Sequence, residues 1–135
     1  MAASWLLDTS ALLALRDDED GAERVAQLLQ AAQSGQAVCF VCFMSRMEVL
    51  YRVWKDEGER HARLADAQVQ SLPIHWVPCS DALLELASAI KACHPLSVAD
   101  AWIAAAAQQQ DAVLVHKDPE FRPLAQIAQE WLGCP

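Results

Sequence analysis

The fold is decided by the stretch Ser4-Trp-Leu-Leu-Asp8-Thr9-Ser10-Ala-Leu12, near the start of the chain. Its short apolar run predicts a buried strand over residues 4–8, and residues 9–16 favour a helix. A carboxylate, Asp8, therefore stands where a buried strand ends. Acidic side chains are rarely buried without a partner, so packing alone does not account for an acid at this position.

Outward from this stretch, short apolar segments alternate with helical patterns. Further strands are predicted over residues 37–43, 74–77 and 112–115. Helices are predicted over residues 23–32, 45–57, 59–71, 80–92 and 98–110, and residues 121–132 are expected to form a short helix, an edge strand or both. This alternation predicts an α/β fold with a parallel sheet covered by helices on both faces. Because 135 residues is the usual size of one domain, a single domain is expected over residues 1–135.

The composition argues against several classes of protein. With 54% hydrophobic and 21% charged residues the chain can form a sizeable core, so global disorder is not expected. It has no uncharged apolar stretch of ~18 residues, as a membrane span would need, and its first residues do not resemble a signal peptide. We therefore expect a cytoplasmic protein that does not enter a membrane. The formal net charge of −8 argues against a general nucleic-acid binder, and any role on nucleic acid must answer that objection.

The five cysteines, at positions 39, 42, 79, 93 and 134, do not predict a disulfide framework. Cys39 and Cys42 form a Cys-x-x-Cys pair inside an apolar strand, where alternation directs them to opposite faces of the sheet. Because no second pair is present to complete a zinc site, we interpret both as small buried apolar residues.

Four acids are predicted at one edge of the sheet. Asp8 ends the first strand and Asp118 follows the fourth. Glu48 lies in the first turn of the helix after the second strand, and Asp100 in the first turn of an alanine-rich helix. Ligands of parallel sheets bind beyond the carboxyl ends of the strands, where all four acids fall. Carboxylates ~4 Å apart repel by about 1–4 kcal/mol and need cations. Oxygen ligands without His or Cys favour Mg²⁺ or Mn²⁺ over Zn²⁺, and such a cation can activate water for attack on a phosphodiester.

A purely structural interpretation accounts for part of this pattern. Ser45-x-x-Glu48 and Ser97-x-x-Asp100 both fit a helix capping box, and Asp118-Pro119 is a common start of a turn. Capping does not explain Asp8, nor why all four acids fall at one edge.

Three segments carry a family resemblance: Leu7-Asp8-Thr-Ser-Ala-Leu12, Ser97-Val-Ala-Asp100-Ala101 with the helix that follows, and Val115-His-Lys-Asp118-Pro-Glu-Phe121. They resemble the motifs of PIN-domain ribonucleases, in particular the VapC-like toxins of type II toxin–antitoxin systems, and Glu48 matches that family's second acid. The resemblance spans nearly the whole chain, in order. It implies a single PIN domain, a three-layer α/β/α sandwich with a central parallel sheet, and endoribonuclease activity that depends on Mg²⁺ or Mn²⁺.

By position, the resemblance makes Asp8, Glu48, Asp100 and Asp118 the catalytic and metal-binding acids. It assigns supporting hydroxyls to Thr9 and Ser10. It also implies an RNA substrate, a homodimer, and a cognate antitoxin whose tail covers the site and can insert an arginine among the acids.

One position departs from the family pattern. Two residues before the fourth acid the family often has a small hydroxyl residue, and this chain has His116. His116 either supports Asp118, contacts a phosphate or closes the strand, and the sequence leaves these alternatives open.

The basic residues offer a partial answer to the charge objection. Arg46 and Arg52, near Glu48, and Lys117, beside Asp118, are candidates for contacts with RNA phosphates, although an ordinary solvated helix face also explains them. Bound cations would cancel part of the negative charge, and the remaining acidity suits a basic partner. The predicted helices over residues 45–57 and 59–71 form a helical hairpin. Five apolar residues in or beside its first helix are expected in the core, in a partner groove or on a dimer surface: Met44, Met47, Leu50, Tyr51 and Trp54.

Other functions fit less well. A haloacid-dehalogenase-like phosphatase needs a second acid two residues after Asp8, where Ser10 stands. A receiver domain needs an aspartate at the end of the central strand. Here the strand predicted over residues 74–77 ends in Val77, and the first acid after it is Asp81, which comes too late in the chain. Two alternatives remain within the same fold: a non-catalytic PIN-fold binding module, and an RNA-processing nuclease without an antitoxin.

Overall fold

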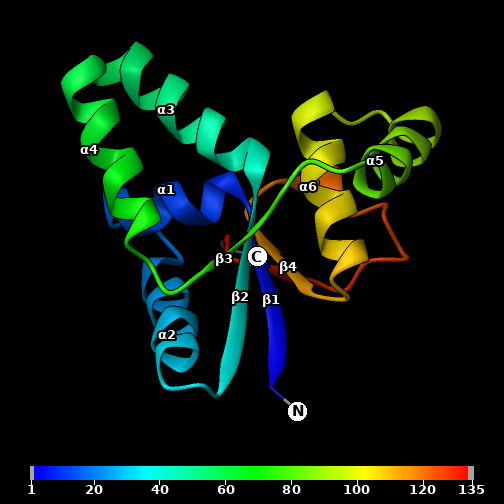
Figure 1. Ribbon diagram of the computed structural model, residues 1–135, viewed down its shortest axis with the longest axis horizontal. Helices are drawn as coiled ribbons and strands as arrows, with labels where there is room; N and C mark the ends of the chain where they lie inside the picture. The colour runs from blue at the N-terminus through cyan, green and yellow to red at the C-terminus, as the bar shows by residue number, and fades with distance from the viewer. Residues whose placement is uncertain (1, 134–135) are drawn as a thin grey trace.

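The computed structural model describes residues 2–133, which form one parallel sheet with helices on both faces (Figure 1). The strands are β1 (Ala3–Leu7), β2 (Ala37–Cys42), β3 (His75–Val77), β4 (Val113–His116) and β5 (Gln129–Trp131). The helices are α1 (Thr9–Asp17), α2 (Ala22–Gln33), α3 (Phe43–Glu57), α4 (Glu59–Gln70), α5 (Asp81–Cys93), α6 (Val98–Gln109) and the short 3₁₀ helix η1 (Pro119–Phe121). Every strand pairing is parallel, which confirms the predicted α/β/α sandwich.

The order of the strands creates a switch point between β1 and β4. The sheet runs β3-β2-β1-β4-β5, so the chain first extends it on one side of β1 and then on the other. The sheet therefore changes direction between β1 and β4, next to the carboxyl ends of these two strands. Ligands of open parallel sheets bind beyond the carboxyl ends of the strands at such a switch point, so the topology alone places a candidate site there.

Two apolar layers hold the helices against the sheet. Helices α1 to α4 cover one face, and α5 and α6 cover the other (Figure 1). Leu7 and Val115 point into the first layer, whereas their neighbours Leu6 and Leu114 point into the second. All four side chains are completely buried, and burial on both faces is why these strands are continuous apolar runs in the sequence.

Cys39 and Cys42 lie on opposite faces of the sheet, as predicted. Cys39 packs in the layer of α1 to α4, and Cys42 in the layer of α5 and α6. Burial raises the pKa of both thiols to about 11, so both stay protonated at neutral pH and pack as small apolar side chains. Cys134 lies outside the described residues.

The start of α3 differs from the prediction. The helix begins at Phe43 and not at Ser45, with Cys42 as an N-cap residue that makes no side-chain capping bond. Ser45 is therefore a buried residue inside the helix, and the predicted Ser45-x-x-Glu48 capping box is wrong. Glu48 lies in the second turn of α3 and not in the first.

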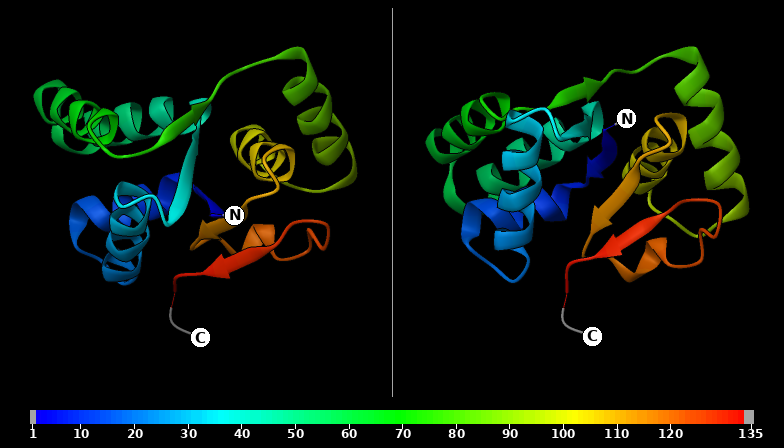
Figure 2. Two further views of the ribbon diagram at one scale, coloured as in Figure 1. Left: turned by 60° about the horizontal axis from the view of Figure 1, so that its bottom comes forward. Right: turned by 90° about the horizontal axis from the view of Figure 1, so that it is seen from below.

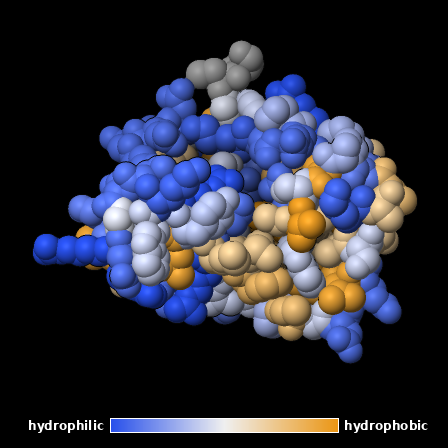
Figure 3. Space-filling view, turned by 90° about the horizontal axis from the view of Figure 1, so that it is seen from above, coloured by the Kyte–Doolittle hydropathy of each residue, from blue (hydrophilic) through white to orange (hydrophobic). Residues whose placement is uncertain are grey.

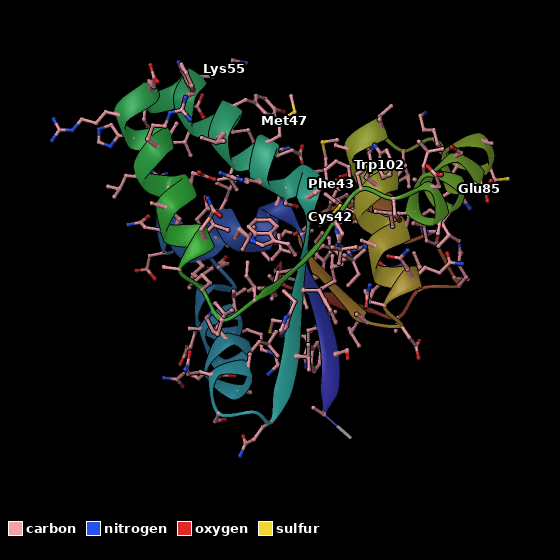
Figure 4. All side chains as sticks on the ribbon, in the orientation of Figure 1. Cys42, Phe43, Met47, Lys55, Glu85 and Trp102 are labelled. Atoms are coloured by element: carbon pink, nitrogen blue, oxygen red, sulfur yellow. The ribbon has the colours of Figure 1, made fainter. Side chains whose placement is uncertain are left out.

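Several large apolar side chains lie on the surface. Leu84 of α5 is 48% exposed, because Leu83, Ala87 and Ile90 form the face that packs inward. In α3, Met47, Tyr51 and Trp54 are exposed, whereas Met44 and Leu50 pack partly against the core. Figure 4 shows Met47 pointing away from the body of the protein. These residues leave an apolar surface open to a partner.

Of the alternatives predicted for residues 121–132, the edge strand forms: β5 pairs beside β4 at the edge of the sheet (Figure 2). The short helix η1 lies earlier, at Pro119–Phe121, and only its last residue falls within the predicted range. Within residues 2–133, none of the helices is long and apolar enough to cross a membrane.

Candidate metal centre

The four predicted acids lie at the carboxyl end of the sheet, around the switch point. Asp8 follows β1 and caps α1, and Asp118 follows the adjacent strand β4 and caps η1. Asp100 lies in the first turn of α6, and Glu48 comes from α3. The negative charges of Asp118 and Glu48 act on Asp8, and those of Asp8, Glu48 and Asp118 act on Asp100. The structure thus brings the four acids together from four separate segments.

Asp8 is a buried acid with a fixed orientation. Its side chain is 3% exposed, and Oδ1 accepts the backbone N–H of Ala11 at 2.8 Å. The Ser10 hydroxyl lies 2.7 and 2.9 Å from the two carboxylate oxygens. Burial raises the pKa of Asp8 to about 7, against the lowering effect of these two hydrogen bonds, and the nearby Asp118 and Glu48 raise it further. Negative charge at Asp8 is therefore costly unless a cation lies nearby.

Three acids come close enough to share one cation. Carboxylate oxygens of Asp100, Asp118 and Glu120 all lie within 4.8 Å of one another. Burial raises the pKa of Asp100 to about 7, and a hydrogen bond with Asp118 and the charges of the other acids add to the shift. Ser97 does cap α6, since its Oγ accepts the Asp100 N–H at 3.1 Å, so capping and a place in the acid cluster coexist at this residue.

Glu120 joins the cluster although the sequence patterns do not predict a role for it. It lies within the third motif, two residues after Asp118. Its position depends on the tight turn after β4, in which Oδ1 of Asp118 accepts the Glu120 N–H at 2.9 Å. The spacing Asp118-Pro-Glu120 was the available signal, because an aspartate that caps a turn brings the residue two positions on back toward itself.

Glu48 is held by neighbours on two helices. Thr9 Oγ1 lies 2.6 Å from a Glu48 oxygen and 3.0 Å from Ser45 Oγ. A carboxylate only accepts and each hydroxyl carries one hydrogen, so Thr9 donates to Glu48 and Ser45 donates to Thr9. The other oxygen of Glu48 accepts from Arg52 at 3.2 Å. Glu48 is therefore buried, at 6% exposed, and its side chain is held in one orientation by these bonds.

Ser10 connects the ends of β1 and β4. While its hydroxyl donates to Asp8, its oxygen accepts the backbone N–H of Lys117 at 3.0 Å. This pair of bonds fixes the distance between Asp8 and the segment that carries Asp118. Thr9 and Ser10, the two predicted supporting hydroxyls, thus lie against different acids.

The donor set fits a hard divalent cation. Asp8, Glu48, Asp100, Asp118 and Glu120 offer only carboxylate oxygens, which Mg²⁺ and Mn²⁺ prefer. The nearest histidine, His116, already uses both ring nitrogens for other hydrogen bonds. Although Arg52 pairs with Glu48, burial and the neighbouring carboxylates still raise the pKa of Asp8 and Asp100 to about 7.

The candidate RNA-binding residues lie at different distances from the acids. Arg52 contacts Glu48 directly and also feels the charge of Asp100. Arg46 instead forms a two-bond pair with Asp66 of α4, at 2.9 and 3.2 Å. The ammonium group of Lys117 lies 3.9 Å from Glu19.

His116 lies under the site and not in it. Its side chain is 1% exposed, so it is shielded from any phosphate that approaches the acids. Its Nδ1 accepts the backbone N–H of Asp118 at 3.1 Å. Of the alternatives left open by the sequence, contact with a phosphate is therefore incompatible with its position.

The fold and the acids at its switch point define a class of protein. A family model described as the PIN domain matches residues 5–127, and the chain belongs to this family. The resemblance predicted from the sequence is thereby confirmed.

Several solved structures with the same fold are described as toxin–antitoxin proteins. The chain is similar to VapBC2 from Rickettsia felis bound to a promoter DNA fragment, with a TM-score of 0.75 and 17% identity over 96% of this chain and 99% of that one. DNA-bound VapBC from Salmonella typhimurium gives a TM-score of 0.75 and 16% identity over 98% and 100% of the two chains. VapC20 from Mycobacterium tuberculosis, described as a toxin that cleaves the sarcin–ricin loop, gives 0.69 and 20% identity over 89% and 94%. No protein of curated function matches the sequence significantly.

Proposed function

We propose that this protein is a metal-dependent endoribonuclease, and specifically the toxin of a VapBC-type toxin–antitoxin pair that acts on RNA in the cytoplasm. The observation that carries the proposal is the acid cluster at the switch point, in which burial and mutual repulsion raise the pKa of both Asp8 and Asp100 to about 7. Such strongly shifted acids are typical of functional sites. Membership of the PIN family and the likeness to a toxin described as cleaving the sarcin–ricin loop support RNA as the substrate.

The residues of the chain divide the work of the proposed site. Asp100, Asp118 and Glu120 would hold Mg²⁺ or Mn²⁺, and Asp8 and Glu48 complete the negative surroundings. The cation, when bound, supplies positive charge that lowers the pKa of a water nucleophile and offsets charge on the phosphate. Because Ser10 and Thr9 fix Asp8 and Glu48, little reorganisation is needed when RNA binds.

Basic residues contribute to the proposed RNA surface in a graded way. Arg52 is the closest to the acids and is 44% exposed, so it can reach a phosphate without leaving Glu48. Arg46 and Lys117 form the outer part of this surface. Reversal of Arg46 and Lys117 to Glu is expected to weaken RNA binding, and unchanged binding and cleavage would contradict this assignment.

The test is cleavage of RNA by purified protein. A total RNA pool is incubated with the protein in Mg²⁺ or Mn²⁺, in EDTA, and in parallel with an Asp100→Asn variant prepared identically. We expect discrete cleavage that requires the cation and disappears in the variant. Cleavage shared equally by the variant would indicate contamination and would refute the assignment of the site.

The same experiment addresses the non-catalytic alternative. If no RNA is cut, calorimetric titration with Mn²⁺ distinguishes a binding module without a metal from a metal-binding nuclease with a narrow substrate range. An Asp56→Asn variant is a suitable control, because Asp56 is an exposed acid on α3 outside the cluster.

We propose an antitoxin as the protein partner. The similar structures from Rickettsia felis and Salmonella typhimurium are complexes of a VapBC pair, which supports a partner for this chain. An apolar pocket between α1 and the α3–α4 hairpin offers a surface for an apolar helix and is lined by Leu12, Leu13, Leu15, Val49 and Val69. Co-purification with the product of a small adjacent gene tests this proposal, and a chain that purifies alone from its native operon favours an RNA-processing nuclease without an antitoxin.

We propose a homodimer through the apolar surface at the carboxyl end of the sheet. Met47 and Val98 are 62% and 61% exposed there, on either side of the edge-to-face contact between Phe43 and Trp102. Figure 4 shows these two rings facing each other between α3 and α6, and Figure 3 shows apolar residues gathered on the α5–α6 side of this surface. A Val98→Lys variant is expected to be monomeric by light scattering, and a wild-type monomer would refute the dimer.

A further inference from the structure

We propose that His116 and Gln129 act as a positioning pair, which holds the turn carrying Asp118 and Glu120 in the geometry that binds the cation. This inference rests on the proposed metal site. It concerns the one position at which the sequence departs from the family motif, and it assigns that position a role outside the reaction itself.

His116 is enclosed at the end of β4. It is the last residue of the strand, and its ring meets those of Phe121 and Trp131 edge-to-face, with centroids 5.0 and 5.5 Å away. Its backbone carbonyl accepts the N–H of Leu132 at 2.8 Å. The imidazole therefore has a single position between η1 and β5.

The hydrogen bonds around Gln129 fix the orientation of its amide. The NH₂ group donates to the carbonyl oxygens of Phe121 and Leu124, at 2.7 and 3.2 Å. Both partners can only accept, so the nitrogen of the amide must face them and its oxygen must face His116. That oxygen lies 2.8 Å from Nε2 of His116.

The same logic fixes the proton on His116. Nδ1 faces the backbone N–H of Asp118, which can only donate, so Nδ1 carries no hydrogen. Nε2 faces an oxygen that can only accept, so Nε2 carries the hydrogen. Every donor and acceptor in the pair is satisfied by one arrangement, with a neutral imidazole.

This arrangement extends to the acids. The amide of Asp118, fixed by His116, sets the direction in which the chain turns, and Oδ1 of Asp118 then accepts the Glu120 N–H. Gln129 meanwhile holds the carbonyl of Phe121, directly after Glu120. Hydrogen bonds thus hold the turn on both sides of Asp118 and Glu120. A small hydroxyl residue at position 116 is too short to reach β5, so the long contact to Gln129 is specific to a residue as large as histidine.

Two variants of similar size separate the contact to Asp118 from the contact to Gln129. In His116→Asn the amide oxygen can occupy the place of Nδ1 and still accept the Asp118 N–H. In His116→Gln the amide reaches the place of Nε2 and keeps a partner for Gln129, but leaves the Asp118 N–H without an acceptor. Both variants lose one contact and stay uncharged, so a general loss of stability affects them alike.

The first readout is the affinity for Mn²⁺ measured by calorimetry on the full chain. We expect His116→Gln to weaken binding by about 10- to 100-fold, as for other residues that orient metal ligands, and His116→Asn to stay within about threefold of the wild type. Gln129→Met keeps the Asp118 contact but frees the carbonyl of Phe121 beside Glu120, so it should also weaken binding, through the second side of the turn. Equal affinities for all four proteins, or losses that only follow the melting temperatures, would overturn the proposal.

The second readout is the tautomer itself, which tests the hydrogen-bond directions on which the pair depends. Nitrogen NMR of the metal-free protein should show a neutral His116 ring with the hydrogen on Nε2, and a hydrogen on Nδ1 would overturn the proposal. The wild type separates the two hypotheses: if it binds Mn²⁺ but cuts no RNA in the pool, the cleavage test of the proposed function is negative while the Mn²⁺ affinities still test the pair. If it binds no Mn²⁺, the positioning role fails as well.

Discussion

The guanidinium of Arg52 lies 3.2 Å from a carboxylate oxygen of Glu48, so one acid of the cluster has a counter-ion within its own helix. The two residues are one turn apart on α3, and Arg52 also feels the charge of Asp100. Arg52 therefore opposes the binding of a cation while it offers a positive group to RNA.

We expect Arg52→Gln to tighten Mn²⁺ binding by about two- to fivefold, because a half-exposed ion pair contributes up to about 1 kcal/mol. The same change should weaken RNA binding. Calorimetry and a filter-binding assay measure the two effects. Arg63→Gln is the matched control, since Arg63 forms an i,i+4 pair with Glu59 on α4. The prediction holds only if Arg52→Gln tightens Mn²⁺ binding and weakens RNA binding while Arg63→Gln changes neither affinity.

The buried acid Asp8 predicts how stability depends on pH without a cation. Its folded pKa of about 7 lies above the ordinary value of 3.8 for an aspartate, so the folded state holds the proton more tightly than the unfolded state does. The free energy of unfolding should then fall as the pH rises from about 4 to about 7. Asp8→Asn removes this loss and should be more stable than the wild type at pH 8 by roughly 4 kcal/mol.

Urea denaturation at pH 4 and pH 8 measures this difference. The Asn oxygen can still accept from Ala11 and Ser10, so the comparison isolates the charge. If wild type and Asp8→Asn have parallel pH profiles, Asp8 is not the source of the loss.

A divalent cation should reverse the same loss. Protons compete with the cation for Asp8 and Asp100, whose pKa values are both about 7, so binding should be stronger at pH 8 than at pH 5. At a hundredfold excess over the dissociation constant, the cation should add about 2.7 kcal/mol of stability. Melting temperatures with Mn²⁺ and with EDTA at the two pH values provide the measurement. A shift of equal size at both would argue against these acids as ligands.

Glu120, which the motifs did not single out, should matter as much as a predicted acid. Glu120→Gln removes one of the three carboxylates that meet within 4.8 Å and should weaken Mn²⁺ binding by about tenfold or more. Glu85→Gln, on the outer helix α5 (Figure 4), is the control. Calorimetry that finds both variants equal to the wild type would remove Glu120 from the site.

The hydroxyl of Thr9 should contribute to stability as well as to the site. Thr9→Val removes one of the two donors of Glu48 and leaves the Ser45 hydroxyl without its acceptor, both in a buried position, and should cost about 1–3 kcal/mol. Thr9→Ser keeps the hydroxyl and should cost much less. Urea denaturation of the two variants decides the point, and equal losses would assign the effect to packing.

The edge at which the acids meet could be predicted from the sequence because it follows from topology. An acid placed after a buried strand must lie at the carboxyl end of a parallel sheet, as Asp8 does. The start of α3 could not be predicted in the same way. Cys42 and Phe43 are apolar, make no side-chain cap and continue the strand pattern, so the sequence carries no signal where the helix begins.

Contacts between segments that are far apart in the sequence could not be predicted either. Leu84 belongs to a helix with more apolar residues than its inner face can hold, and periodicity does not say which of them remain outside. The partner of His116 is 13 residues away on an edge strand that was predicted only as one of several alternatives. Its role depends on hydrogen-bond directions, which exist only once β5 lies beside β4.

Gln129 also follows every acid of the cluster in the order of synthesis. If it fastens the turn of Asp118 and Glu120 as proposed, a growing chain carries all five carboxylates before it can hold them in place. The full affinity for the cation would then be reached only when the edge strand has docked, after synthesis of the acids is complete.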